Sequence, residues 1–267
     1  MINYIKKIDQ LVQDDYLEQL NKSGVDVPDK NKKIFTRIGG ASEQCELIYS
    51  YIPSNQRILV IGLFGGRDYW WGRIKGHDVY GLDLVKYDWD QTYVANAEDV
   101  WPFSNKFFDV IIISEVMEHL FNDVNALNES HRVLKDNGKL ILTVPFLDSN
   151  DAFHVRMHDE KTIEHLLNHS KYRVIHINER PGLLFKNILN KLIMGLTIIS
   201  YSIFKINILK HLLKIVFDIE VILSKKKLFR RFFKVLNFID YGATIVSVKT
   251  NESINYEEVN KKEFKNA

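Results

Sequence analysis

The sequence predicts a doubly wound α/β fold, with a mostly parallel seven-stranded sheet and a helical insertion before the last strand. From residue 57 onward, short apolar runs alternate with stretches of helical spacing, which is typical of a parallel sheet covered by helices on both faces. The run 109–113 is continuously apolar after its first residue, as expected of a central strand. A glycine-rich turn follows the run 57–61, and such turns join strands to helices in this fold class.

The expected helices and strands follow from these patterns in chain order. Residues 69–74 predict a short aromatic helix, and 120–134 place apolar residues at helical spacing. The stretch 136–138 is predicted to end that second helix, because its glycine tolerates the left-handed conformation found at helix C-termini. A further helix is expected at 162–167 with Asp159 as its cap. Strands are expected at 57–61, 79–82, 93–95, 109–113, 139–144, 173–178 and 243–249.

The composition predicts a globular protein of a reducing compartment. The single cysteine, Cys45, offers neither a disulfide framework nor a metal-ligand cluster, so no metal site is expected. Residues 1–15 mix charged and apolar side chains and lack the apolar core of a signal peptide. We therefore expect a cytoplasmic location, with or without peripheral contact with a membrane.

One segment, 183–240, differs from the rest of the chain in charge. It carries 11 Lys and Arg against 3 Asp and Glu, in a chain whose net charge is only +2. Because the basic charge is local, a nucleic-acid-binding surface spread over the protein is not expected. Its longest uncharged run, 192–204, is too short to span a bilayer. The segment is predicted to be an apolar, basic helical insertion that acts as a lid over the substrate or lies on a membrane surface.

These observations predict a division of the chain around one α/β core. An N-terminal helical extension precedes the core, and a tail follows its last strand. The predicted boundaries are 1–55 for the extension, 56–182 for the cofactor-binding core, 183–240 for the insertion, 241–250 for the last strand and 251–267 for the tail.

Residues that follow the strands indicate a nucleoside-binding site, because ligands of open parallel sheets bind beyond the carboxyl ends of the strands. Gly62, Gly65 and Gly66 let the backbone approach a ligand closely. Asp83 ends the second strand about 20 residues later, where a carboxylate can accept bonds from both hydroxyls of a ribose. A nicotinamide dinucleotide would use the same acid, but the sequence lacks the full glycine pattern of that fold.

Several motifs together resemble class I S-adenosylmethionine-dependent methyltransferases, in particular the broad small-molecule group. ILVIGLFGG at 58–66 resembles the first motif of this family, and AEDVWPFSNKFFDVIIISEVMEHL resembles its stretch through the fourth strand. RVLKDNGKLILTVPF and HVRMHDEKTIEHLL are similar to later segments. The resemblance implies a Rossmann-like fold, S-adenosylmethionine as cofactor and a small-molecule or lipid-linked acceptor.

The resemblance also implies roles for individual residues. The glycine turn would line the methionine end of the cofactor and Asp83 would hold its ribose. Leu84 would pack on the adenine, and Glu115 would face the amino-acid portion of the cofactor. Near the adenine amino group the resemblance places Asn96, Ala97 and Glu98.

Two departures from the family pattern leave an alternative open. Val60 replaces the acidic residue of the first motif, and Phe64 replaces its middle glycine. The alternative is therefore a non-catalytic, membrane-associated protein that keeps a degenerate methyltransferase fold.

Histidines near the expected ligand edge are candidates for catalysis. If the acceptor is a hydroxyl, a general base assists the transfer, and histidine suits that role near neutral pH. His119 and His154 both follow strands at this edge and are the predicted catalytic residues. The aromatic residues at 69–71 are expected in the core, with an aromatic wall beside the sulfonium as the alternative.

Overall fold

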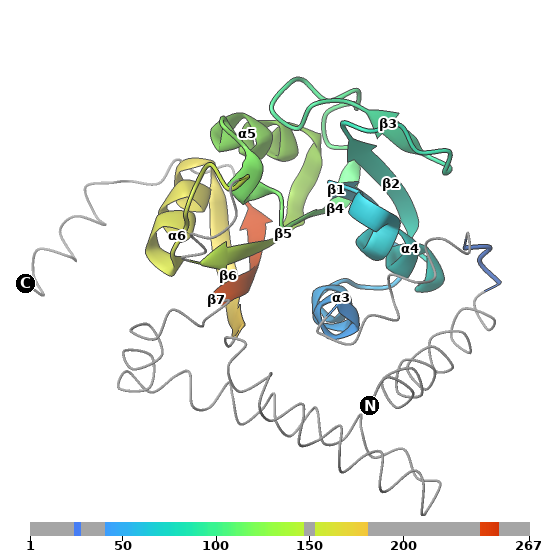
Figure 1. Ribbon diagram of the computed structural model, residues 1–267, viewed down its shortest axis with the longest axis horizontal. Coiled ribbons are helices and arrows are strands. Elements are labelled where there is room, and N and C mark those ends of the chain that lie inside the picture. Colours follow the sequence, from blue (N-terminus) through green and yellow to red (C-terminus); the bar gives the residue numbers. More distant parts are fainter. Residues whose placement is uncertain (1–23, 28–40, 147–152, 181–240, 251–267) are drawn as a thin grey trace, which may run out of the picture.

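The computed structural model describes residues 24–27, 41–146, 153–180 and 241–250. These residues build a seven-stranded sheet in the order β3-β2-β1-β4-β5-β7-β6, shown with its covering helices in Figure 1. All neighbouring strands pair in parallel except β7, which runs antiparallel to both β5 and β6. The predicted doubly wound α/β fold with a mostly parallel sheet is therefore confirmed.

The strands lie where the apolar runs predict them. The first run matches its strand residue for residue, whereas most others extend by one or more residues into the flanking loops. The strands are β1 (Arg57–Ile61), β2 (Asp78–Asp83), β3 (Thr92–Val94), β4 (Phe108–Ser114), β5 (Leu134–Phe146), β6 (Tyr172–Arg180) and β7 (Tyr241–Lys249).

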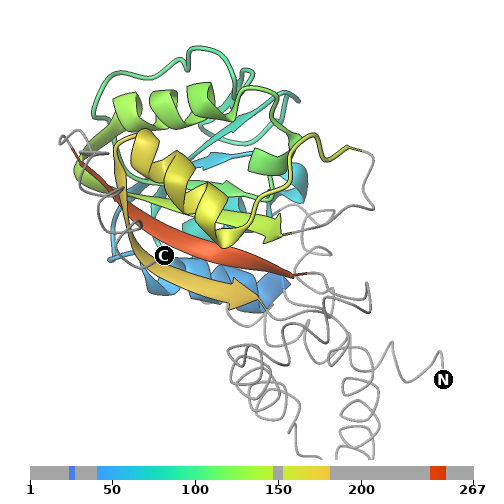
Figure 2. The ribbon, with the colours of Figure 1, turned by 90° about the vertical axis from the view of Figure 1, so that its left-hand side faces the viewer.

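Helices cover both faces of the sheet, as Figures 1 and 2 show. The helices α3 (Ala41–Ser50) and α4 (Arg67–Ile74) pack on one face, and α5 (Asp123–Val133) and α6 (Glu160–His169) pack on the other. Alternate residues of β1 belong to the two separate cores, because successive side chains of a strand point to opposite faces. Asp159 and Thr162 form a capping box at the start of α6, so the predicted cap is confirmed.

The predicted end of the helix α5 is wrong. The helix ends at Val133, and Leu134 already pairs with Phe108 as the first residue of β5. The residues 135–138 instead form an irregularity in β5, after which Lys139 pairs with Val110. Within it, Asn137 rather than the glycine takes the left-handed conformation, with φ 59°, which asparagine tolerates better than most residues.

Parts of the predicted domain organisation lie outside the described residues. These are the insertion 183–240, the tail and most of the N-terminal extension. Within the extension, α3 contributes Cys45, Ile48 and Tyr49 to the same core as α4. None of the helices in the described part of the chain has the length and apolar character needed to cross a membrane.

Three histidines make the stability of the fold sensitive to mild acid. Burial lowers the pKa values of His77, His131 and His158 below their usual 6.5. The unfolded chain therefore takes up protons below about pH 6.5 that the folded chain resists, so stability is complete above that pH and is lost as the pH falls. Each histidine contributes a slope of up to about 1.4 kcal/mol per pH unit.

We expect His158→Gln to flatten this dependence, because His158 is the most deeply buried of the three. Urea unfolding between about pH 7.5 and pH 5.5 measures the slope, in a range above the titration of the carboxyl groups. His165→Gln on the exposed side of α6 is the control and should retain the slope of the parent protein. An equal slope in all three proteins would contradict the contribution of His158 to the pH dependence of stability.

Candidate functional site

The turn after β1 requires glycine at the positions that the sequence singled out. Gly62, Gly65 and Gly66 have φ values of 76°, 72° and 80°, in the left-handed region that other residues rarely adopt. A Cβ on Gly66 would lie 2.6 Å from Cδ1 of Trp70 and 2.7 Å from Cη2 of Trp89. The turn therefore keeps its backbone close to the start of α4, with no side chain at Gly66.

Asp83 lies at the end of β2 and faces this turn. Its Oδ2 accepts a hydrogen bond from the backbone N of Leu63 at 2.6 Å, and its Oδ1 accepts one from the backbone N of Val85 at 3.0 Å. Each carboxylate oxygen can accept a further bond. The side chain is half-buried. The carboxylate that is predicted to bind the ribose is therefore oriented by the glycine turn and remains accessible to solvent.

The two departures from the family pattern have different structural consequences. Phe64 is 93% exposed, so its ring points away from the turn and does not fill the space beside Asp83. Val60 is 1% exposed and packs in the core beneath α3 and α4. The chain therefore lacks a carboxylate at position 60, but the bulky residue at position 64 leaves the turn open.

Among the residues predicted near the adenine, one side chain is exposed and the others are buried or hydrogen-bonded within the protein. Leu84 is exposed beside Asp83, whereas Ala97 is buried. Asn96 accepts a bond from the backbone N of Glu98 through its Oδ1, at 3.0 Å. The carboxylate of Glu98 accepts bonds from the backbone N of Phe121 and of the next residue, at 2.6 and 3.2 Å, so it anchors the loop before α5.

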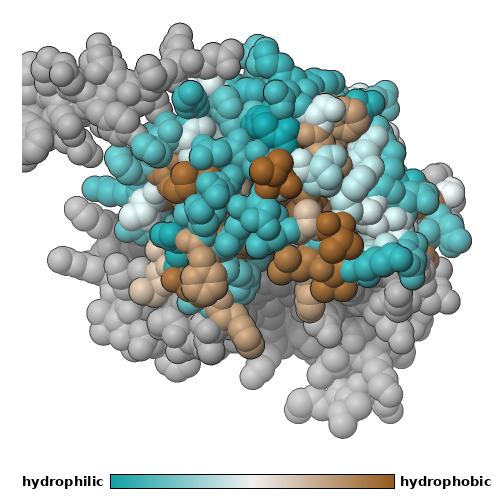
Figure 3. Space-filling view, turned by 90° about the horizontal axis from the view of Figure 1, so that it is seen from above, coloured by the Kyte–Doolittle hydropathy of each residue, from teal (hydrophilic) through white to brown (hydrophobic). Residues whose placement is uncertain are grey.

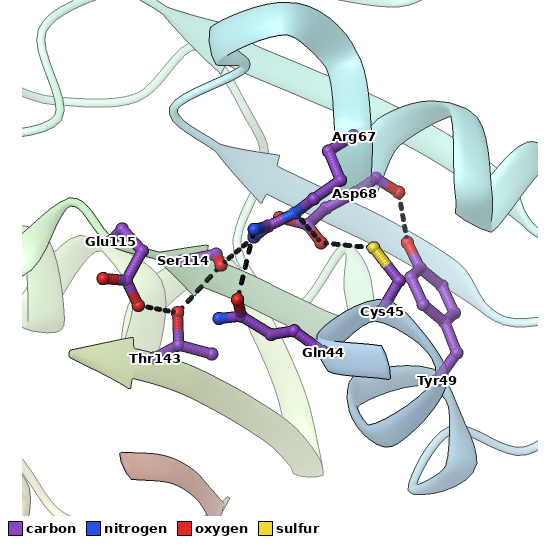
Figure 4. A network of polar contacts seen from close by, with 8 residues as sticks. All are labelled: Gln44, Cys45, Tyr49, Arg67, Asp68, Ser114, Glu115 and Thr143. Carbon is purple, nitrogen blue, oxygen red and sulfur yellow. Dashed lines mark hydrogen bonds and ion pairs between the residues drawn. The ribbon is translucent and has the colours of Figure 1, made fainter. Parts of the chain in front are cut away.

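Glu115 follows β4 and belongs to a polar network that sequence reasoning missed (Figure 4). Its Oε1 accepts a bond from Oγ1 of Thr143 at 2.8 Å, and the same Oγ1 lies 2.8 Å from Oγ of Ser114. Arg67 at the start of α4 donates to Oγ of Ser114, and also to Oε1 of Gln44 on α3 at 3.2 Å. The network connects the ends of β4 and β5 with the helix that follows the glycine turn.

A buried ion pair fixes Arg67 in this network. Two of its nitrogens donate to the two oxygens of Asp68, at 3.2 and 2.8 Å, and the two side chains are 18% and 6% exposed. Burial opposes the positive charge, but the adjacent Asp68 outweighs it and holds the pKa of Arg67 above its usual range. Burial raises the pKa of the Cys45 thiol, which therefore stays protonated and donates to Asp68.

The two predicted catalytic histidines lie together. The ring centroids of His119 and His154 are 4.8 Å apart. His119 ends the short helix η2 (Met117–His119) after β4, and Nδ1 of its ring lies 3.1 Å from the backbone O of Phe153. Backbone bonds from Val155 to Glu118 join the two segments at 2.9 Å. The structure thus brings together two side chains that are far apart in sequence.

The aromatic residues of α4 belong to the core. Tyr69, Trp70 and Trp71 are buried, and Tyr69 stacks on Trp89 with ring centroids 5.3 Å apart. Core packing was the expected role, and it agrees with these positions.

Exposed apolar side chains gather near the carboxyl ends of the strands. They follow β1, β2, β4 and β5. Figure 3 shows one face of the molecule, on which separate hydrophobic patches interrupt a mostly hydrophilic surface. Such patches commonly mark ligand or partner sites. The most exposed after these four strands are Phe64, Leu84, Phe121, Phe153 and Met157, and Val100 after β3 is also exposed.

Residues 65–142 match the family model described as a methyltransferase domain. In this region the chain is similar to methyltransferase domains, in agreement with the resemblance that its motifs show.

The curated relatives of this chain match short segments only. The uncharacterized protein MJ0638 of Methanocaldococcus jannaschii is 46% identical over 48 residues, which cover 18% of this chain and 21% of that protein. The uncharacterized protein MJ1123 of the same organism is 37% identical over 68 residues, or 26% of this chain and 31% of that protein. The chain thus spans less than a third of the length of either relative.

Solved structures are similar over most of the chain. The YcgJ protein of Bacillus subtilis aligns with a TM-score of 0.54 and 17% identity, over 79% of this chain and 100% of that chain. The 1,6-didemethyltoxoflavin-N1-methyltransferase of Burkholderia thailandensis, which holds 1,6-didemethyltoxoflavin and S-adenosylhomocysteine, aligns with a TM-score of 0.53 and 14% identity, over 89% and 90% of the two chains. At these identities the similarity shows the fold.

Proposed function

We propose that the protein transfers a methyl group from S-adenosylmethionine to a small-molecule acceptor. The observation that carries the proposal is the position of Asp83, whose carboxylate is oriented by the open glycine turn at the carboxyl edge of the sheet. A half-buried carboxylate at this edge suits the two hydroxyls of a ribose. The family match of residues 65–142 supports the same cofactor.

The residues around the turn fit the parts of this cofactor. The backbone of Gly62–Gly66 would contact its methionine end, and Asp83 would accept bonds from its ribose hydroxyls. Leu84 presents an exposed apolar surface to an adenine ring, and Asn96 supplies a side-chain amide beside it. Glu115 extends from the end of β4 toward the same edge, where a carboxylate suits a methionine ammonium group.

When bound, S-adenosylmethionine supplies a methyl group on a positively charged sulfur, and the methyl moves to an acceptor atom in line with the breaking bond. The main task of the protein is to hold the acceptor in that line, which can contribute about 7 to 11 kcal/mol. His119 and His154 lie beyond β4 and β5, on the side that we assign to the acceptor. A neutral imidazole there can accept a proton from an acceptor hydroxyl.

Exposed apolar side chains beside these histidines support an acceptor with a hydrophobic portion. Phe121 and Phe153 flank the segments that carry His119 and His154 and are 75% and 77% exposed. A flat or aliphatic small molecule would bury part of this surface. The role of 183–240 as lid or membrane-surface element stays a prediction, because that segment lies outside the described residues.

Isothermal titration calorimetry with S-adenosylmethionine and S-adenosylhomocysteine tests the cofactor. We expect one binding site per chain for either molecule. A separate titration with NAD should show no heat of binding. Absence of binding at millimolar concentration would favour the alternative, a non-catalytic protein that keeps the fold. That alternative is motivated by the missing carboxylate at Val60, whose buried side chain makes no polar contact with the turn.

A further inference from the structure

Three potential metal ligands meet at the acceptor side of the sheet. The ligand atoms of Glu118, His119 and His154 all lie within 4.8 Å of one another. Glu118 is 2% exposed, His154 is half-buried and His119 is exposed, so the cluster extends from the protein interior to the surface. Two imidazoles and one carboxylate form a ligand set that binds divalent transition metals in many enzymes.

Backbone contacts hold these three side chains in register. The backbone O of Glu118 accepts bonds from the backbone N of Val155 at 2.9 Å and of Arg156 at 3.2 Å. Arg156 also forms an ion pair with Asp123 at 3.3 Å. The segment that carries His154 is therefore tied directly to the backbone of η2, and the cluster does not depend on side-chain contacts alone.

A hydrogen bond prepares His119 as a ligand. Nδ1 of His119 lies 3.1 Å from the backbone O of Phe153. A carbonyl oxygen can only accept, so Nδ1 carries the proton and donates, and Nε2 keeps a lone pair. Ligating histidines commonly donate their other ring nitrogen to a carbonyl or carboxylate in this way. The contact thus provides the second layer of interactions that metal sites use to orient an imidazole.

We propose that Glu118, His119 and His154 bind one divalent transition-metal ion. Metal–ligand distances of about 2.1 Å place ligand atoms roughly 3 to 3.5 Å apart. The cluster would have to contract by rotation of the exposed His119 ring and the half-buried His154 ring, while the buried Glu118 stays in place. Three protein ligands leave coordination positions open for a further molecule, as in catalytic sites.

The open positions suit an oxygen atom of the acceptor, and this part of the inference rests on the function proposed above. A hydroxyl coordinated to the ion has a lowered pKa and releases its proton to solvent. The acceptor oxygen then forms a bond to the methyl carbon while the sulfur–methyl bond breaks, giving a methoxy product and S-adenosylhomocysteine. The inferred acceptor class is a hydroxylated small molecule, and the two histidines hold the ion instead of accepting the proton directly.

Calorimetric titration of the full chain with Zn²⁺ alone tests the site. We expect one Zn²⁺ per chain, and a loss of roughly 100-fold or more in affinity for His119→Ala and for His154→Ala, because even outer-layer changes cost about 10 to 100-fold. Glu118→Gln preserves the shape of the buried side chain and should weaken binding similarly. His165→Ala and His169→Ala on α6 are matched controls that should retain it.

A second measurement counts the ligating histidines in the parent protein itself. The chain has 9 histidines, and in protein with ¹⁵N-labelled histidine we expect one equivalent of Zn²⁺ to shift the imidazole resonances of two of them. The single-alanine variants that fold assign those resonances to His119 and His154. Shifts in a different set, or in none at millimolar Zn²⁺, would overturn the proposal, as would unchanged affinity in both alanine variants.

The outcome is distinguishable from failure of the proposed function. The metal titration contains neither cofactor nor acceptor, and none of the three ligands is among the residues that we assign to the cofactor. We expect His119→Ala and His154→Ala to bind S-adenosylmethionine as the parent protein does. Zn²⁺ binding without S-adenosylmethionine binding would refute the methyltransferase function and leave the metal site standing, and the reverse result would refute the metal site alone.

Discussion

Replacing Asp83 by alanine is expected to weaken S-adenosylmethionine binding by at least about 100-fold, because each hydrogen bond to a charged group contributes about 1.5 to 3 kcal/mol and the ribose offers two hydroxyls. The substitution also removes the acceptor for the backbone N of Leu63 in the glycine turn. Calorimetric titration of the purified variant gives the change in affinity.

Asp78→Asn is the matched control, because Asp78 begins the same strand at the opposite edge of the sheet and forms an exposed ion pair with Arg57. Its affinity for the cofactor should equal that of the parent protein. Asp83→Asn keeps one side-chain oxygen for the bond from Leu63. It therefore distinguishes loss of the negative charge from a change in the conformation of the turn. Equal affinity in Asp83→Ala and in Asp78→Asn would refute the assigned role of Asp83.

Arg67→Met is expected to destabilise the fold by about 3 kcal/mol, since removing one partner of a buried ion pair leaves the other charge uncompensated. Asp68 is 6% exposed, and it would lose both bonds from the guanidinium while keeping the donor Sγ of Cys45. The free energy of unfolding in urea measures the effect. The figure lies at the low end of the usual range because Arg67 is itself 18% exposed.

Two further variants test the cause of this loss. Arg67→Met combined with Asp68→Asn removes both charges and should recover part of the stability. Arg73→Met on the same helix breaks a pair with Asp90, which is 85% exposed, so it should cost less than about 1 kcal/mol. A double variant no more stable than Arg67→Met would show that the uncompensated charge of Asp68 is not the cause of the loss.

The element pattern of the core was predictable because it depends on residues close together in the chain. The apolar run Arg57–Ile61 matches β1 residue for residue, and the box of Asp159 and Thr162 starts α6 as expected. Both signals arise from periodicity and from contacts within one helical turn. The end of α5 was not predictable, because the pairing of Leu134 with Phe108 in a neighbouring strand overrides the local helix-stop signal.

Part of the site was predictable for a topological reason. Parallel strands bring their carboxyl ends to one edge, so the glycine turn after β1 and Asp83 after β2 meet once the sheet forms. Leu84 and Glu115 also follow strands at this edge, and their contacts with the cofactor stay predictions. The hydrogen bonds of Glu98 to the loop before α5 were not predictable, because they depend on a contact between distant parts of the chain.

The sequence by itself therefore determined the order of strands and helices, the glycine turn and the acid that faces it. Only the tertiary structure decided that Phe64 points outward, that Arg67 and Asp68 form a buried pair with Gln44, and which side chains approach one another beyond β4 and β5. Glu118 directly precedes His119, yet nothing local indicates that His154 lies beside them. The physical reason is that local patterns set backbone conformation, whereas burial and approach of distant side chains depend on how the layers pack.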